Sequence, residues 1–302
     1  MMKTHAALKH LKKGWALTLC LWLASTLLSA PSANAAEEKR QRMVYEVYAG
    51  GIHAVQGKLD MDMRKPGRYD FIMQATTRGF LGSMIPWKGT FQSHGWRMGE
   101  SDFQPQKHQS TASWRDEIDI KKYLYNKDGT FKSLTITDER RDNEKREVDA
   151  EVTDGTIDTL TAALEVFETY TKTNKCEGEA EVFDGKRRFK QIFRHQQNVE
   201  LTSSKYNIYE GPAAECTVEV VPVSGDWHEK PRGWMSIQEQ GREKGTMPTV
   251  WVAQLAEGQP AIPVKIRVKT DYGTLFMHLA EYESADKILV AEKRVKEEEP
   301  TE

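Results

Sequence analysis

The chain has 302 residues, 38% of them hydrophobic and 29% charged, with a formal net charge of −2. A slightly acidic chain lacks the large basic surface that nucleic-acid phosphates require, so we expect no nucleic-acid partner. The length is sufficient for one large β domain or two small ones with a substantial buried core.

The first 35 residues have the order of a cleavable secretory signal. Four lysines and no acid precede an apolar stretch over residues 15–28, which ends in small residues and the triplet Ala33-Asn34-Ala35. The stretch is shorter than the roughly 20 residues that span a bilayer, which argues against an uncleaved anchor. We predict cleavage after Ala35 and a periplasmic mature protein without a membrane span. Losing the four lysines changes the net charge from −2 to −6.

Segments typical of β-strands follow and dominate the chain. Aromatic and β-branched residues occur between Gly, Asp and Asn at residues 43–49, 68–77, 90–98, 118–125 and 131–136. Residues 126–129, Asp184-Gly185 and residues 270–273 are typical of hairpin turns. These patterns predict a mainly β fold: a large antiparallel curved sheet, forming an open β-barrel or β-spiral with one packed helix and one disulfide.

Two adjacent glycines, Gly50 and Gly51, fall inside the first strand pattern. Glycine within a strand is typical of a bulge or of a close approach of another backbone. A bulge that bends the sheet is one interpretation. A strand edge open to a ligand or partner is the other.

One segment has helical spacing. Ile157, Leu160, Leu164 and Phe167 recur at intervals of three and four residues, and Asp158 can cap the start. We predict a helix over residues 158–170 that packs against the sheet as core. The last residues are strongly charged, so we predict a single β domain over residues 36–285 and a disordered tail over residues 286–302.

A charged block follows the predicted hairpin turn at Asp184. Alternation along the strand places Arg187 on the apolar inner face and Arg188 on a basic outer face. An inward arginine needs a partner, and Asp184 is the nearby candidate. A structural ion pair is one interpretation. The other is a site for an anion or an acidic partner at Asp184, Arg187 and Arg188, because a guanidinium binds phosphate or carboxylate well.

Two cysteines, Cys176 and Cys216, remain after signal cleavage. An even number of cysteines in an exported chain favours a disulfide over a redox or metal-binding pair, whose members usually lie closer in sequence. The cross-link would stabilise the fold by roughly 3–4 kcal/mol on a chain-entropy estimate.

Signatures of catalysis are missing from the sequence. The six histidines after residue 35 show no metal-ligand spacing, and no nucleophile elbow or nucleotide-binding glycine motif occurs. We therefore assign no catalytic residue, no metal and no cofactor. Abundant Asp and Glu leave open a glycan or cell-wall hydrolase that uses a carboxylate pair.

Several blocks together resemble the bacterial domain-of-unknown-function family 3108. They are residues 45–54 (YEVYAGGIHA), 155–164 (GTIDTLTAAL), Cys176, 182–189 (VFDGKRRF), 209–216 (YEGPAAEC) and 262–268, followed by Gly273. Thr159 stands where the family usually has proline after the helix-capping aspartate. The resemblance implies an exported envelope protein with a disulfide-linked β fold, and it brings no established catalytic residues.

Three functions remain in view. The leading hypothesis is a non-catalytic periplasmic envelope protein that binds a lipid-like ligand, a glycan or a protein partner in the concave face of its sheet. The alternatives are the carboxylate-pair hydrolase and a scaffold that pairs strands with a partner. A roomy apolar cavity would favour the carrier, and a filled interior would favour the scaffold.

Overall fold

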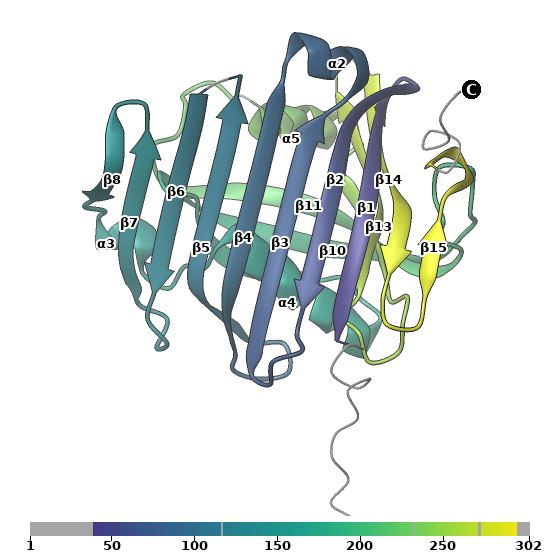
Figure 1. Cartoon of the computed structure of the whole chain (residues 1–302), viewed down its shortest axis with the longest axis horizontal. Coiled ribbons are helices and arrows are strands. Elements are labelled where there is room, and N and C mark those ends of the chain that lie inside the picture. Colours follow the sequence, from purple (N-terminus) through teal and green to yellow (C-terminus); the bar gives the residue numbers. More distant parts are fainter. Residues whose placement is uncertain (1–38, 116, 232, 271–272, 295–302) are drawn as a thin grey trace, which may run out of the picture. The chain divides into compact units, whose positions relative to one another are not determined.

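A computed structural model describes residues 39–294 except 116, 232 and 271–272 (Figure 1). All of these residues belong to one compact unit, Ala33–Glu302. The predicted signal sequence and residues 295–302 lie outside the described residues. No helix in the described part of the chain is long and apolar enough to cross a membrane.

In the part of the chain that the structure describes, fifteen strands form one antiparallel, curved and unclosed sheet. Along the sheet the order is β8-β7-β6-β5-β4-β3-β2-β1-β14-β13-β12-β11-β10-β9, and β15 pairs with β14. Within the described residues the two edge strands, β8 and β9, do not pair with each other. Ile157 instead bridges to Val182 on the outer edge of β9.

The first eight strands are consecutive antiparallel neighbours. Their bounds are β1 Arg40–Ala49, β2 Ile52–Asp62, β3 Arg68–Thr77, β4 Trp87–Arg97, β5 Phe103–Trp114, β6 Glu117–Tyr125, β7 Phe131–Asp138 and β8 Arg141–Arg146.

The remaining strands form the other half of the sheet. They are β9 Gly178–Phe183, β10 Arg187–Leu201, β11 Gly211–Gly225, β12 Thr249–Ala253, β13 Ile262–Thr270, β14 Gly273–Glu283 and β15 Ile288–Val290. The halves join where β14 pairs with β1, with Met43 opposite Tyr282.

Among the described residues, four helices accompany the sheet: α2 Gly79–Met84, α3 Ala150–Thr153, α4 Thr159–Thr173 and α5 Trp234–Glu243. The helix α4 begins after Asp158, whose carboxylate accepts hydrogen bonds from the backbone N–H groups of Leu160 and Thr161. It ends at Asn174, which has the left-handed backbone conformation common at helix ends. Figure 1 shows α4 at the opposite end of the strands from α2 and α5.

Most of the predicted elements are confirmed. The five predicted strand segments correspond to β1, β3, β4, β6 and β7, and the predicted turns at residues 126–129 and Asp184-Gly185 join antiparallel neighbours. The predicted turn at residues 270–273 lies between the antiparallel strands β13 and β14, but its residues 271–272 lie outside the described residues. The predicted helix is α4, which extends three residues further, to Thr173. Cys176 and Cys216 form the predicted disulfide, with their Cα atoms 6.1 Å apart.

The interpretations of Gly50 and Gly51 are corrected. Both residues form the two-residue turn between β1 and β2 instead of lying inside a strand. Both have positive φ, 57° and 89°, which glycine adopts without the steric penalty of other residues. They also do not form a free edge, because β1 pairs on both sides, with β2 and β14.

The predicted disordered tail starts too early. Residues 288–290 form β15, and Arg294 pairs with Glu46 at 2.7 Å and with Glu281 at 2.8 Å. Glu46 is buried on β1, so its carboxylate needs a cationic partner. This requirement fixes the chain up to residue 294 against the sheet.

Candidate functional site

An apolar cavity of about 530 Å³ lies between the two halves of the sheet. Inward residues of β1, β2 and β3 line one wall, namely Tyr45, Val47, Val55, Leu59, Phe71 and Met73. Residues of β10 to β13 line the facing wall, among them Phe189, Phe193, Val218, Val220, Val250 and Ile266. The volume is within the range of small-molecule sites, about 300–1,000 Å³.

The helix α4 closes one end of this cavity. Leu160, Ala163 and Phe167 recur at intervals of three and four residues, so they share one helix face, and all three line the cavity. The sequence predicted this face as core alone. Leu160, Leu164 and Phe167 are buried as predicted, and Leu160 and Phe167 also form the floor of the cavity. Ile157 lies before the helix and bridges to Val182.

The opposite end of the cavity leads toward α2 and α5. Val47 and Val55 are cross-strand neighbours close to the β1–β2 turn, and Ala75 lies two residues before the end of β3. All three line the cavity, as does Trp234 at the start of α5, whose side chain is also exposed. Trp234 therefore lies at an opening of the cavity, which we call its mouth.

Charged groups are nearly absent from the cavity lining. No Asp or Glu lines the cavity in the described part of the chain. Lys58 of β2 is also among the lining residues. Its strand neighbours Gly57 and Leu59 face the cavity, so the Lys58 side chain points to the other face of the sheet. Burial raises the pKa of the Tyr45 phenol well above its ordinary value, so this group adds no charge to the lining.

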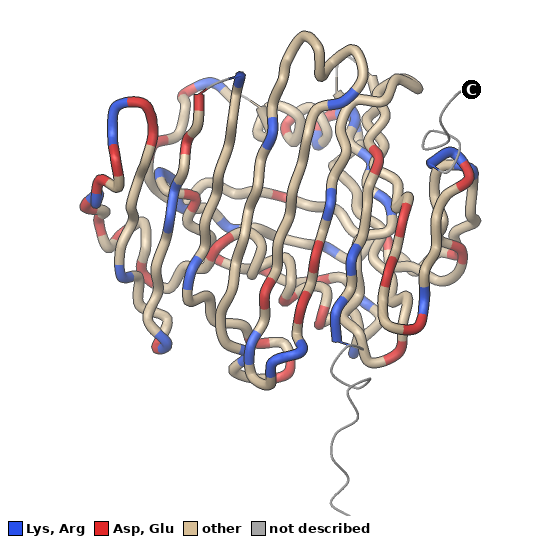
Figure 2. The backbone as a smooth tube through the Cα atoms, in the orientation of Figure 1, with Lys and Arg blue, Asp and Glu red and all other residues tan. Residues whose placement is uncertain are grey.

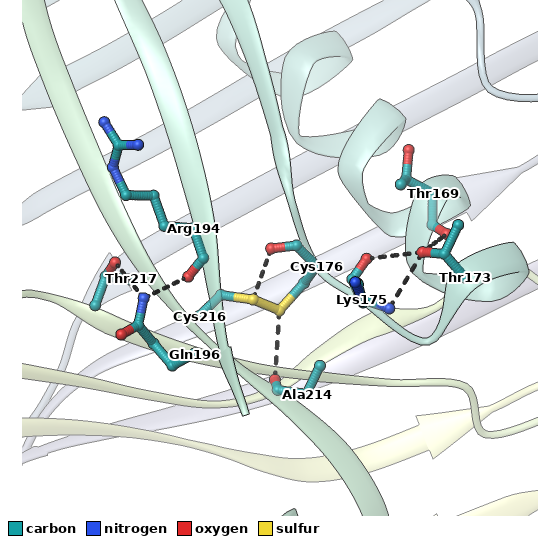
Figure 3. Close-up of a disulfide and its surroundings, with 9 residues drawn as sticks. All are labelled: Thr169, Thr173, Lys175, Cys176, Arg194, Gln196, Ala214, Cys216 and Thr217. Carbon is teal, nitrogen blue, oxygen red and sulfur yellow. Dashed lines mark hydrogen bonds between the residues drawn. A yellow bond between two sulfur atoms is a disulfide. The ribbon is translucent and has the colours of Figure 1, made fainter. Parts of the chain in front are cut away.

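The disulfide fixes the floor of the cavity to a wall. Cys176 follows the end of α4, and Cys216 lies in β11, which lines the cavity through Val218 and Val220 (Figure 3). His195 on β10 lies beside the two sulfur atoms. Because the sulfurs are bonded to each other, they are not thiolate ligands for a metal.

A buried polar network occupies the opposite face of α4. Ser93 Oγ donates to Asp158 Oδ1 at 2.5 Å and lies 2.7 Å from His108 Nδ1. Thr161 donates to the other Asp158 oxygen at 2.6 Å, and Tyr69 is hydrogen-bonded to Thr161 at 2.7 Å. Burial alone would raise the pKa of Asp158. The charge of His108 and the hydrogen bonds from His108, Ser93 and Thr161 outweigh this effect and lower that pKa to about 2.

The Ser93, His108 and Asp158 network differs from a hydrolytic triad. In such a triad the serine and the aspartate contact opposite nitrogens of the imidazole. Here Ser93 and Asp158 both approach Nδ1 of His108, at 2.7 and 3.1 Å. The serine is also fully buried and donates its proton to the carboxylate. The geometry is that of a structural hydrogen-bond network that holds the start of α4.

The charged block at Asp184 is held by internal ion pairs. Arg187 donates to Asp184 Oδ2 from Nε and Nη2, at 2.8 and 2.6 Å, and lies over the Trp227 ring. Arg188 donates to Glu181 at 2.9 Å. Arg187 is the first residue of β10, and its side chain is 38% exposed, so the expected inward burial is wrong. The pairing favours the structural interpretation. The anion site stays a prediction.

The Asp184-Gly185 turn is hydrogen-bonded to a side chain of β6. Tyr123 donates its hydroxyl proton to the Asp184 carbonyl at 2.8 Å. A Cβ at Gly185 would lie 2.6 Å from that hydroxyl, so only glycine fits the approach. The block of residues 182–189 therefore contacts the first half of the sheet at β6.

The sequence signals missed both the cavity and the network. Ser93 and His108 are cross-strand neighbours on β4 and β5, but each is a single polar residue inside a strand. Only a known strand register brings them together with Asp158. The cavity has no motif, because residues that line it follow the same alternation as residues of a filled core.

These features define a class of protein: a curved antiparallel β-sheet folded around an apolar cavity, with one helix as the floor. The family described as "Protein of unknown function (DUF3108)" matches residues 44–280, and the chain belongs to this family. The crystal structure of a beta-barrel-like protein of the domain of unknown function DUF1849 from Brucella abortus is similar at 9% identity and a TM-score of 0.46. That match covers 83% of this chain and 100% of the other. No curated protein matches.

Proposed function

We propose that the protein is a non-catalytic carrier in the periplasm that binds the apolar chain of a lipid-like ligand in the cavity between the two halves of its sheet. The observation that carries this proposal is the apolar lining of a cavity of about 530 Å³. Transfer of an acyl chain from water to such a lining is favourable by about 0.8 kcal/mol per buried CH₂ group.

The lining favours a lipid over a glycan. Each sugar hydroxyl that enters an apolar cavity without a partner loses its hydrogen bonds to water, at a cost of about 1–3 kcal/mol. The Thr249 hydroxyl at the cavity already donates to the Met247 carbonyl. The lining also opposes the hydrolase hypothesis for this cavity, since a paired-acid mechanism needs two carboxylates beside the substrate.

The test is binding of the fluorescent fatty acid cis-parinaric acid to the wild-type chain and to cavity-filling variants. Ala75 and Ala163 line opposite parts of the cavity, so Ala75→Phe and Ala163→Phe place a ring in the ligand's space. Thr76→Phe is the matched control, because Thr76 neighbours Ala75 on β3 but does not line the cavity.

We expect one bound probe per wild-type chain, weakening of roughly tenfold or more in the filled variants, and little change for Thr76→Phe. Native mass spectrometry of protein purified from its own periplasm should then show a copurified lipid. A folded wild-type chain that binds neither the probe nor a copurified lipid contradicts the proposal. Equal binding by both filled variants also contradicts it.

A further inference from the structure

Exposed apolar side chains gather at the mouth end of the sheet. Ten large apolar residues in the described part of the chain have exposed side chains, and six of them lie at this end: Ile52, Phe80, Met84, Trp114, Ile118 and Trp234. Figure 1 shows α2, α5 and the β1–β2 turn together at this end. Such a cluster is typical of an interaction site.

The most exposed members of this cluster lie on α2. Phe80 and Met84 are 72% and 58% exposed, and their spacing of four residues places them on one helix face. Ile52, 62% exposed, lies at the start of the adjoining strand β2. An apolar surface of this kind is unfavourable in water, so it needs an apolar partner.

Hydrogen bonds at both ends of α2 fix this helix to the sheet, with the exposed side chains pointing outward. The Arg78 backbone N–H donates to the Ala54 carbonyl at 2.8 Å, which ties the start of α2 to β2. Thr77 links the two ends of the segment that joins β3 to β4 and contains α2. Its hydroxyl donates to the Ile85 carbonyl at 2.7 Å and accepts from the Trp87 N–H at 3.0 Å. The exposed face is therefore part of the folded structure.

The charge pattern indicates which partner this surface fits. Residues 79–87 contain no charged side chain, and exposed Arg78 and Lys88 stand directly before and after them. Figure 2 shows the segment that contains α2, between β3 and β4, as an uncharged stretch. Trp87 and its cross-strand partner Trp114 lie at the same level. An apolar tip with cations and tryptophans at its base matches the depth profile of a bilayer surface with anionic headgroups.

We propose that the surface formed by Ile52, Phe80, Met84, Trp114 and Trp234 docks on an anionic lipid bilayer, with Phe80 and Met84 entering the acyl region. Docking there presents the mouth of the cavity to the membrane. The inference goes beyond ligand binding, because it depends on the exposed side chains and not on what the cavity holds.

The test is flotation with vesicles of phosphatidylethanolamine and phosphatidylglycerol. We expect the wild-type chain to float with the vesicles and Phe80→Ser/Met84→Ser to lose at least roughly tenfold in partition. The matched control is Ile288→Ser/Val290→Ser, which removes two exposed apolar side chains from β15, and it should float like the wild type. Arg78→Gln/Lys88→Gln should weaken binding to these vesicles and leave binding to neutral vesicles unchanged.

Hydrogen exchange on the wild-type chain gives a readout that needs no variant. Vesicles should protect residues 79–87 and leave residues 288–290 unchanged. The proposal is overturned if the wild-type chain does not float, if the α2 variant floats equally well, or if the β15 control loses as much. Capture of a protein partner by this surface without vesicle binding also overturns it. The α2 variant should still bind cis-parinaric acid, so this proposal and the carrier function fail separately.

Discussion

The two faces of α4 border two differently filled regions of the same sheet. On one face Leu160, Ala163 and Phe167 border a cavity. On the other, Asp158 and Thr161 join Ser93, His108 and Tyr69 in a buried hydrogen-bond network. Beyond this network, aromatic residues of β6 pack against Phe183, with Leu134 of β7 fully buried among them.

The difference between the two faces of α4 indicates which region stabilises the fold. The polar face is hydrogen-bonded through Asp158 and Thr161, and its aromatic neighbours are buried, so this side holds α4 in position. The cavity face forgoes van der Waals contacts that a filled core would make. The proposed carrier function assigns this open region to a ligand. The predictions below test this contrast.

The largest expected effect compares two truncations, one in each region. Leu134→Ala in the filled region should lower the free energy of unfolding by about 3 kcal/mol, because it creates a new cavity in a packed core. Met277→Ala at the cavity wall should lower it by about 1 kcal/mol, because Met277 already borders empty space. Urea unfolding of both variants measures the difference. Equal losses would mean that the two regions are packed alike.

The next effect concerns the network that supports α4. The pKa of Asp158 is about 2 in the folded chain against an ordinary value of 3.8. A lowered carboxyl pKa stabilises the fold above pH 4, and that stability is lost as the pH falls toward 2. Asp158→Asn should therefore destabilise the chain by about 2 kcal/mol at pH 7 and flatten the pH dependence between pH 4 and 2.

The control for this variant is Asp119→Asn, at an exposed position of β6. It should change the free energy of unfolding by less than about 0.5 kcal/mol. If both aspartate variants behave alike, the buried network does not hold α4.

The smallest effect has the opposite sign. Burial raises the pKa of Glu165 to about 7, against a hydrogen bond from the Phe103 N–H. A raised carboxyl pKa means that the folded chain binds the proton more tightly, so stability decreases as the pH rises from about 4.5 to 7. Glu165→Gln should gain about 1 kcal/mol at pH 8, after allowance for partial solvent screening, and little at pH 4. An unchanged pH profile would show that Glu165 is well solvated.

The sequence predicted local structure better than spatial arrangement. Strand alternation, the capping residue Asp158 and the turn at Asp184 act over a few residues, and the structure confirms them. The prediction for Gly50 and Gly51 failed because strand-like residues on both sides of a two-residue turn have the same pattern as one strand with two glycines inside it. The tail prediction failed because the partner of Arg294, Glu46, lies 248 residues away. Composition cannot reveal such a pairing.

The candidate site was predictable only in outline. A concave β-sheet and a disulfide were expected, but the apolar cavity depends on the positions of walls built from residues far apart in sequence, such as Phe71 and Phe193. The exposed α2 surface lies in a segment with no predicted element. The proposed docking depends on the exposure of Phe80 and Met84, which the sequence alone does not determine.

The pairing of β1 with β14 has a consequence for how the chain folds. The strand β1 lies in the middle of the sheet, yet one of its two neighbours is β14, so Met43 meets Tyr282 only after almost the whole domain has been synthesised. Contacts between residues so distant in sequence slow folding, because a long loop must close first. Until β14 arrives, β1 has an open edge and both halves of the sheet expose apolar faces. We therefore expect slow folding and a nascent chain that needs protection from aggregation until its last strands are available.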